Sequence, residues 1–130
     1  MLRNRGSVVL IQNHEVALIR RNWNGKIYYV FPGGGIEKGE TPKQAAKREA
    51  YEELGVQVSI GDLLTILDSK GKQYYFYADI VSGEFGTGQG EEFSNTYRGT
   101  YEPLWVPIKD FPSLDIRPPK VAEMILHSEF

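Results

Sequence analysis

The sequence predicts a small α/β protein in which helices cover a mixed β-sheet. Runs rich in β-branched and aromatic residues lie before and after one well-bounded helical segment, and a second helical segment closes the chain. The order is therefore strands, helix, strands, helix, not the regular alternation that builds a parallel sheet. A length of 130 residues suits one domain, so we expect a single domain over residues 1–130.

Three strands are expected before the first helix. Ser7–Gln12 and Glu15–Arg21 are β-rich runs separated by a short polar turn, which predicts a hairpin. An Asn-Gly turn signal follows, and Ile27–Phe31 reads as the third strand. Pro32 has no N–H to donate to a ladder, so this strand is expected to end there.

Thr41–Leu54 carries the clearest helix signals. Thr41 is a preferred N-cap residue, Pro42 suits the first helical position, and Gln44 completes a capping box. Gly55 follows at the position where a left-handed residue ends a helix.

The second half of the chain is expected to hold three strands and a closing helix. Residues 82–95 are glycine-rich and polar and read as a long loop, which hints at function. The remaining expected elements are strands at Val56–Leu67, Tyr74–Val81 and Thr100–Pro107, a short turn at Ile108–Phe111, and a helix at Lys120–His127.

Composition excludes several classes of protein. The formal net charge of -2 predicts no broad basic face for long nucleic acid. No run approaches the roughly 20 apolar residues of a membrane span, and Gly6–Ile11 is too short for the apolar part of a signal peptide. The chain lacks cysteine, which fits a reducing compartment. We expect a cytoplasmic protein with a small-molecule partner.

Three glutamates share one face of the predicted helix. Glu49, Glu52 and Glu53 are spaced by three and four positions, and carboxylates this close repel one another. Something must compensate for that repulsion, and we expect a divalent cation to do so. Oxygen-only ligands favour Mg²⁺, with Mn²⁺ as the alternative, over Zn²⁺. The competing interpretation is a solvated acidic face. Small residues beside this face favour close approach of a backbone or ligand: Ala45, Ala46 and Ala50.

A glycine run precedes the helix. Gly33-Gly34-Gly35 reads either as a flexible loop or as a segment that brings backbone groups close to metal-bound phosphate. Glu40 lies at the helix entrance, where the helix dipole favours an anion. Arg48 can pair with Glu40 and fix this segment against the helix.

These residues together resemble the complete Nudix box. Five residues separate Gly34 from Glu40, and seven more lead to Arg48-Glu49-Ala50-Tyr51-Glu52-Glu53-Leu54-Gly55-Val56, so every fixed position is filled. The preceding strands, the Phe31-Pro32-Gly33-Gly34 entry and the chain length also resemble small MutT-like Nudix hydrolases.

The resemblance implies a Nudix-type α/β/α sandwich with a mixed sheet. It implies Mg²⁺-dependent hydrolysis of a diphosphate linkage in a nucleoside diphosphate joined to a further group. Carried over by position, the metal ligands are Glu49, Glu52, Glu53 and the Gly33 carbonyl, and Glu52 is alternatively the residue that activates water. Arg48 and Glu40 orient this set, and Gly34 lies beside the bound phosphates.

Residues outside the box complete the expected site. Glu91 and Glu92, in the glycine-rich loop, are the preferred general bases, and Glu102 is a further candidate. Arg20 and Arg21, at the end of the second expected strand, are candidates to meet substrate phosphates. The alternative for each is an exposed surface charge.

The substrate class stays open between two kinds of reaction. A nucleoside triphosphate pyrophosphohydrolase suits the short chain, and Tyr74 has the spacing from the box seen in some dinucleoside polyphosphate hydrolases. The alternative is a catalytically silent module that senses nucleotides or binds RNA, although such modules commonly lose box carboxylates. Homodimers are frequent in the family, and one is expected here.

Overall fold

The computed structural model describes residues 3–88 and 99–128, and these fall into two compact units. The first unit comprises Met1–Leu10 and Pro32–Gln89, and the second comprises Ile11–Phe31 and Gly90–Phe130. Strand β1 (Arg5–Gln12) begins in the first unit and ends in the second, so one strand belongs to both.

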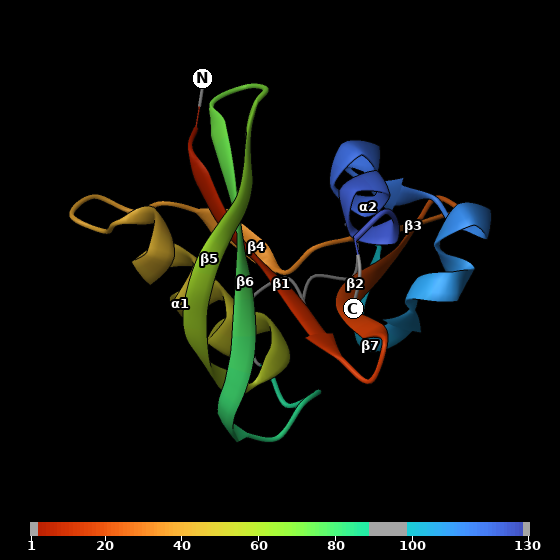
Figure 1. Cartoon of the computed structure of the whole chain (residues 1–130), viewed down its shortest axis with the longest axis horizontal. Coiled ribbons are helices and arrows are strands. Elements are labelled where there is room, and N and C mark those ends of the chain that lie inside the picture. The colour runs from red at the N-terminus through yellow and green to blue at the C-terminus, as the bar shows by residue number, and fades with distance from the viewer. Residues whose placement is uncertain (1–2, 89–98, 129–130) are drawn as a thin grey trace. The chain divides into compact units, whose positions relative to one another are not determined.

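The first unit is a four-stranded mixed sheet with one helix packed on it. Its strand order is β5-β6-β1-β4, in which β1 runs parallel to β6 and every other pair is antiparallel. Helix α1 packs against β4, β5 and β6 (Figure 1). The bounds are β4 Gly33–Gly35, α1 Pro42–Leu54, β5 Val56–Asp68 and β6 Lys72–Gly83.

Local signals set both ends of α1. The Thr41 side chain accepts from the Gln44 N–H, and the Gln44 side chain accepts from the Thr41 N–H, so the predicted capping box is present. Gly55 takes the left-handed conformation with φ 81° and donates to the Tyr51 carbonyl. The helix predicted from sequence is therefore confirmed at both ends.

The small residues of α1 allow β1 to pack closely against it. Ala45, Ala46 and Ala50 are fully buried. A Cβ atom on Gly6 would collide with the Pro42 carbonyl and lie tightly against Ala46. The expectation that these alanines admit another backbone is confirmed, and that backbone is β1.

The second unit contains a second four-stranded sheet and the closing helix. The strand order is β7-β2-β3-β8, and the last residues of β1 also pair with β2. Helix α2 packs on β8 and on the 3-10 helix η3. The bounds are β2 Glu15–Trp23, β3 Lys26–Val30, β7 Thr100–Pro107, η3 Ile108–Ser113, β8 Ile116–Arg117 and α2 Pro119–Leu126.

Several expected elements differ from the structure. Gly33–Gly35 is a short strand, not a loop, because its backbone pairs with Arg5–Ser7 of β1. Strand β2 continues to Trp23, because it stays paired with β3 and β7 beyond the predicted end. Residues 108–113 form a 3-10 helix where only a turn was expected, and the two-residue β8 was missed. No helix in the described ranges is long and apolar enough to cross a membrane.

Candidate active site

The glycine strand β4 packs so closely against α1 and β1 that its residues have no room for side chains. All three of its residues are buried. A Cβ atom on Gly34 would overlap the Glu49 carboxylate, and one on Gly33 would overlap the Ser7 side chain. Glycine is therefore required at these positions by close packing, which brings the helix carboxylates against the β4 backbone.

Arg48 joins β4, the entrance of α1 and the helix carboxylates. Its Nε and Nη2 atoms donate to the two Glu40 carboxylate oxygens, at 2.7 and 3.1 Å, as a bidentate pair. Nη2 also donates to the Gly35 carbonyl at 3.0 Å. Nη1 donates to Glu49 at 3.2 Å and to Glu52 at 3.1 Å. The predicted pairing with Glu40 is present, and the same guanidinium also holds Glu49 and Glu52.

The charges of Arg48 and of its carboxylate partners stabilise one another. The Arg48 hydrogen bonds hold the pKa of Glu40 below its ordinary value, and the Glu37 N–H lowers this pKa further by donating to the same carboxylate. The pKa of Arg48 is raised, chiefly by Glu40 and then by Glu49 and Glu52. Both groups therefore stay charged at neutral pH, with the guanidinium central to the carboxylates.

Glu53 faces the glycine strand more deeply than the other helix glutamates. The residue is 8% exposed and accepts from the Gly33 N–H at 2.7 Å. The Glu49 side chain is 16% exposed, whereas that of Glu52 is 38% exposed. Exposure thus increases from Glu53 through Glu49 to Glu52, and β4 lies at the buried end.

The candidate ligands have the chemistry that a hard divalent cation prefers, but their side chains do not converge on one point. All the candidate ligands are oxygen atoms, as Mg²⁺ prefers. Within residues 3–88 and 99–128, however, no three Asp, Glu, His or Cys side chains converge to hold an ion. The reason is that Arg48 engages Glu49 and Glu52 while Glu53 binds the Gly33 N–H. Arg48 therefore holds two of the carboxylates that the sequence analysis expects to bind a metal.

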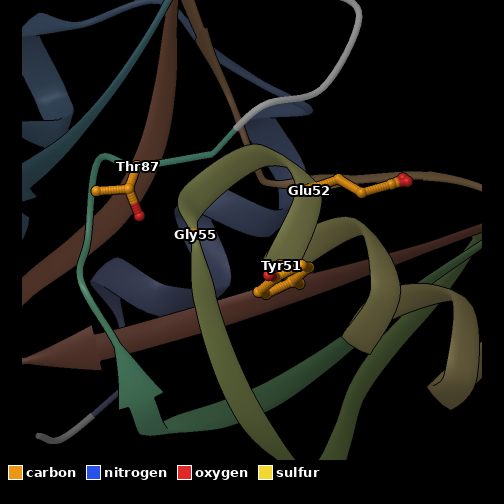
Figure 2. Close-up of a pocket in the computed structure, with 4 residues that line it drawn as sticks. All are labelled: Tyr51, Glu52, Gly55 and Thr87. Atoms are coloured by element: carbon orange, nitrogen blue, oxygen red, sulfur yellow. The ribbon is translucent and has the colours of Figure 1, made fainter.

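A pocket of about 320 Å³ opens at the C-terminal end of α1. Figure 2 shows its lining residues, and the Glu52 side chain points away from Tyr51 and Thr87. The segment after β6 closes against the helix end, because Gly86 donates to the Leu54 carbonyl at 2.8 Å. Gly88 lies against the backbone of Glu52 and Glu53.

The preferred general bases follow this segment directly. Glu91 and Glu92 come three and four positions after Gly88 in the chain, and both lie outside the described residues. Gly88, within the glycine-rich segment 82–95, is itself in contact with the backbone of Glu52 and Glu53.

The remaining candidates lie in the second unit. Arg20 pairs with Glu102 at 3.5 Å, directly across β2 and β7. Arg21 is stacked between Tyr101, at 3.7 Å from the ring centroid, and Tyr28, at 5.7 Å. Both arginines were predicted at the end of this strand, but they lie within β2. Side chains of neighbouring strands contact each of them.

Sequence reasoning missed two arginines that contact β4. The Arg5 guanidinium donates to the Gly33 carbonyl at 3.3 Å, and the Arg3 guanidinium lies against Gly35. Burial raises the pKa of the Tyr75 hydroxyl, and the charge of Arg5 offsets part of that rise. The only available signal was their two-residue spacing before an apolar strand, which places both on one side of a strand.

Comparison with known proteins identifies the family of this arrangement. The sequence model described as "NUDIX domain" matches residues 1–126. The chain belongs to the NUDIX family. The predicted box, Gly34–Val56, lies on β4, α1 and the first residue of β5.

Individual relatives are similar to this NUDIX chain over part of its length. Diphosphoinositol polyphosphate phosphohydrolase 2 of Rattus norvegicus is 39% identical over 54 residues, which cover 42% of this chain and 30% of that protein. The RNA pyrophosphohydrolase of Tolumonas auensis is 44% identical over 54 residues, again 42% and 30%. The chain thus spans about a third of the length of these relatives.

A solved structure agrees over nearly the whole NUDIX fold. The MutT NUDIX hydrolase from Burkholderia pseudomallei superposes with a TM-score of 0.74 and 20% identity, covering 97% of this chain and 98% of that one. The expected α/β class with a mixed sheet and the MutT-like resemblance are thereby confirmed.

Proposed function

We propose that this NUDIX chain hydrolyses a diphosphate linkage in a nucleotide-like substrate with the help of Mg²⁺ or Mn²⁺. The observation that carries the proposal is the set of hydrogen bonds centred on Arg48, which we call the Arg48 hub. One guanidinium holds Glu40, Glu49 and Glu52 together beside the glycine strand, while Glu53 binds the same strand. A solvated acidic helix face has no need for buried glycines or for a buried carboxylate.

The box residues have distinct proposed roles in binding a cation. Glu49, Glu52, Glu53 and the Gly33 carbonyl supply its oxygen ligands, whereas Arg48 and Glu40 orient them. When bound, a divalent cation neutralises diphosphate oxygens and makes water a stronger acid. Gly34 lets the Glu49 carboxylate lie directly against the β4 backbone, and we propose that it lies beside the bound phosphates.

The reaction itself requires one proton transfer and one bond exchange. The oxygen of water bonds to one phosphorus, the bond from that phosphorus to the bridging oxygen breaks, and the base takes the water proton. We propose Glu91 or Glu92 as that base, since the chain reaches them directly from Gly88 beside the box. Glu102 is a weaker proposal, because its carboxylate pairs with Arg20.

Chemistry and the named relatives together give four kinds of substrate to test. Nucleoside triphosphates and dinucleoside polyphosphates remain our first two candidates. The matched relatives are named for diphosphoinositol polyphosphates and for RNA pyrophosphate removal, which adds two further substrates to test. The alternative of a silent sensing or RNA-binding module is disfavoured by the complete set of box carboxylates.

We test the function by product release from a substrate panel, with Mg²⁺ and with chelator. The panel holds nucleoside triphosphates, dinucleoside polyphosphates, ADP-ribose, diphosphoinositol polyphosphates and 5′-triphosphate RNA. Glu53→Gln is expected to keep the fold and lose at least about 100-fold in turnover, because it weakens a proposed metal ligand. Glu91→Gln and Glu92→Gln identify the base by a slower chemical step with little loss of metal affinity.

The outcomes distinguish the hydrolase from the nucleotide-sensing module. Metal-dependent turnover that is lost in Glu53→Gln supports the hydrolase and names its substrate. Equal rates for wild type and Glu53→Gln at saturating Mg²⁺ contradict the assigned ligand set. Binding of nucleotides without turnover of any panel member favours the sensing module.

The organisation of the whole chain is also proposed. We propose that residues 1–130 act as one NUDIX domain in which β1 joins the two units, and that the protein forms a homodimer in the cytoplasm. We propose a small anionic substrate as its partner. We propose that it binds neither a membrane nor long nucleic acid.

A further inference from the structure

The two-residue turn between β2 and β3 consists of Asn24 and Gly25. The ladder closes directly around this turn, because Trp23 pairs with Lys26. Asn24 and Gly25 have φ values of 53° and 76°, and a tight turn of type I′ requires positive φ at both positions. All four residues are exposed, and a Cβ atom on Gly25 would have nothing within 4 Å. The Asn24 side chain and the Gly25 N–H therefore lie together at an open hairpin tip.

An asparagine side chain can react with the backbone nitrogen that follows it. The Gly25 nitrogen bonds to the side-chain carbonyl carbon of Asn24, and the bond from that carbon to the amide nitrogen breaks. Ammonia leaves with the proton that the Gly25 nitrogen loses, and a cyclic imide remains. Water then opens the imide at its side-chain carbonyl, which gives aspartate, or at its backbone carbonyl, which gives isoaspartate. Glycine favours the first step because it has no Cβ to shield the attacking nitrogen.

Other asparagines of the chain lack this combination of features. Asn24 is the only one that glycine follows. The Asn4 side chain accepts from the Lys72 N–H at 2.9 Å, which holds its amide in place. Asn22 lies within β2, where its backbone is paired with Ile27. Sequence and exposure therefore single out the β2–β3 turn.

The turn between β1 and β2 provides a comparison within the same molecule. Asn13 and His14 have φ values of 52° and 62° and are exposed, and Gln12 pairs with Glu15 around them. The sign of φ, the length of the turn and the exposure match those of the β2–β3 turn. The main difference is the residue after the asparagine, because the His14 side chain stands beside the nitrogen that would attack.

We propose that Asn24 is a site of spontaneous deamidation, and that its two products affect the β2–β3 hairpin differently. Aspartate preserves the turn, because Asp-Gly also favours type I′. Isoaspartate carries the backbone through the former side chain and lengthens the turn, so the pairing of Trp23 with Lys26 no longer fits. The same register places Tyr28 beside Arg21, whose guanidinium lies 5.7 Å from the ring centroid. Isoaspartate therefore loosens this contact.

The test follows Asn24 and Asn13 in one sample of the wild-type protein, by peptide mapping with mass spectrometry. Asn24 is expected to convert at least about tenfold faster than Asn13, because no Cβ shields its attacking nitrogen. Both rates should rise with pH, since that nitrogen must lose its proton. Each conversion turns a neutral amide into a carboxylate, so the formal net charge changes from -2 to -3 and ion exchange separates the product. An endoprotease that cuts before aspartate but not before isoaspartate distinguishes the two products.

Exchange of the following residues provides matched variants. Gly25→His is expected to slow Asn24 to the rate of Asn13, and His14→Gly is expected to accelerate Asn13 to the rate of Asn24. Asn24→Asp should keep the wild-type thermal midpoint, whereas the separated isoaspartate form should unfold at a lower temperature.

Three results overturn the inference. Equal rates at Asn13 and Asn24 in the wild type would show that the following glycine does not decide reactivity. An unreactive Asn24 in the folded protein, under conditions where the urea-unfolded chain converts, would show that the paired turn holds the reacting atoms apart. An isoaspartate form with the wild-type midpoint would contradict the predicted effect on the hairpin.

Discussion

At the scale of single residues, Arg48 organises the site. It makes hydrogen bonds to Glu40, Glu49, Glu52 and the Gly35 carbonyl, so one cation offsets the repulsion of the helix carboxylates. The three glutamates of one helix face therefore have different partners: Arg48 of the same helix compensates Glu49 and Glu52, and Glu53 accepts from the Gly33 N–H. We expect a cation to compete with Arg48 for Glu49 and Glu52.

Glu40 provides a pH test of this hub. Its pKa is lowered from an ordinary value of 4.5, chiefly by the Arg48 hydrogen bonds. A group with a lowered folded-state pKa adds stability above its unfolded pKa, and this stability is lost as the pH falls through the folded pKa. Glu40→Gln is therefore expected to destabilise the protein by about 1 kcal/mol at pH 7, after allowance for solvent screening.

Urea unfolding at several pH values checks this expectation. The difference in stability between wild type and Glu40→Gln should be constant near neutral pH and should shrink below pH 4.5, where the unfolded chain takes up the proton first. A difference that stays the same, or grows, on acidification would show that the Glu40 charge does not stabilise the hub.

At the scale of elements, the contact of β1 with α1 positions the site. Gly6 lets the strand approach the backbone of α1, and β1 in turn pairs with β4. The glycine strand and the carboxylates are thus held in register by one close contact between a strand and a helix.

Gly6→Ala is expected to destabilise the protein by roughly 1–3 kcal/mol, because the added methyl group overpacks against backbone that cannot turn aside. Gly61→Ala is the matched control: its nearest atom would be the Tyr77 carbonyl at 3.4 Å, an ordinary contact. Thermal unfolding should separate the two variants clearly. Equal midpoints would mean that α1 and β1 have more freedom than their packing indicates.

At the scale of the whole molecule, the question is whether the two units fold together. Strand β1 passes from one to the other, and each unit has its own buried core. Fully buried side chains include Leu10, Leu54, Val56 and Val58 in the first unit and Leu18, Ile19, Val121 and Ile125 in the second. A strand shared without a break favours one cooperative unfolding unit.

Tryptophan fluorescence tests this coupling. Both tryptophans, Trp23 and Trp105, lie in the second unit, whereas Gly6 lies in the first. If the units unfold together, Gly6→Ala lowers the midpoint of the tryptophan transition as much as that of far-ultraviolet circular dichroism. An unchanged tryptophan midpoint, with a shifted circular dichroism midpoint, would instead indicate two independently folding units.

The sequence by itself determined the features that depend on near neighbours in the chain. The ends of α1 were predictable because capping groups lie within four residues of the backbone atoms they bind. The pairing of Arg48 with Glu40 was predictable because both occupy fixed positions around that helix start. All the strands except β4 and β8 were predictable in type, although β2 runs two residues further than its pattern indicated.

Only the tertiary structure decided which distant segments meet. Gly33–Gly35 became a strand because β1 offers it a partner, and nothing in three glycines specifies that partner. Arg5 lies 28 positions from Gly33, and Asn4 lies 68 positions from Lys72. Such contacts depend on strand register and close packing across the sheet, which local propensity does not encode. For that reason the carboxylates were visible in the sequence, whereas the contacts of Arg3 and Arg5 with β4 were not.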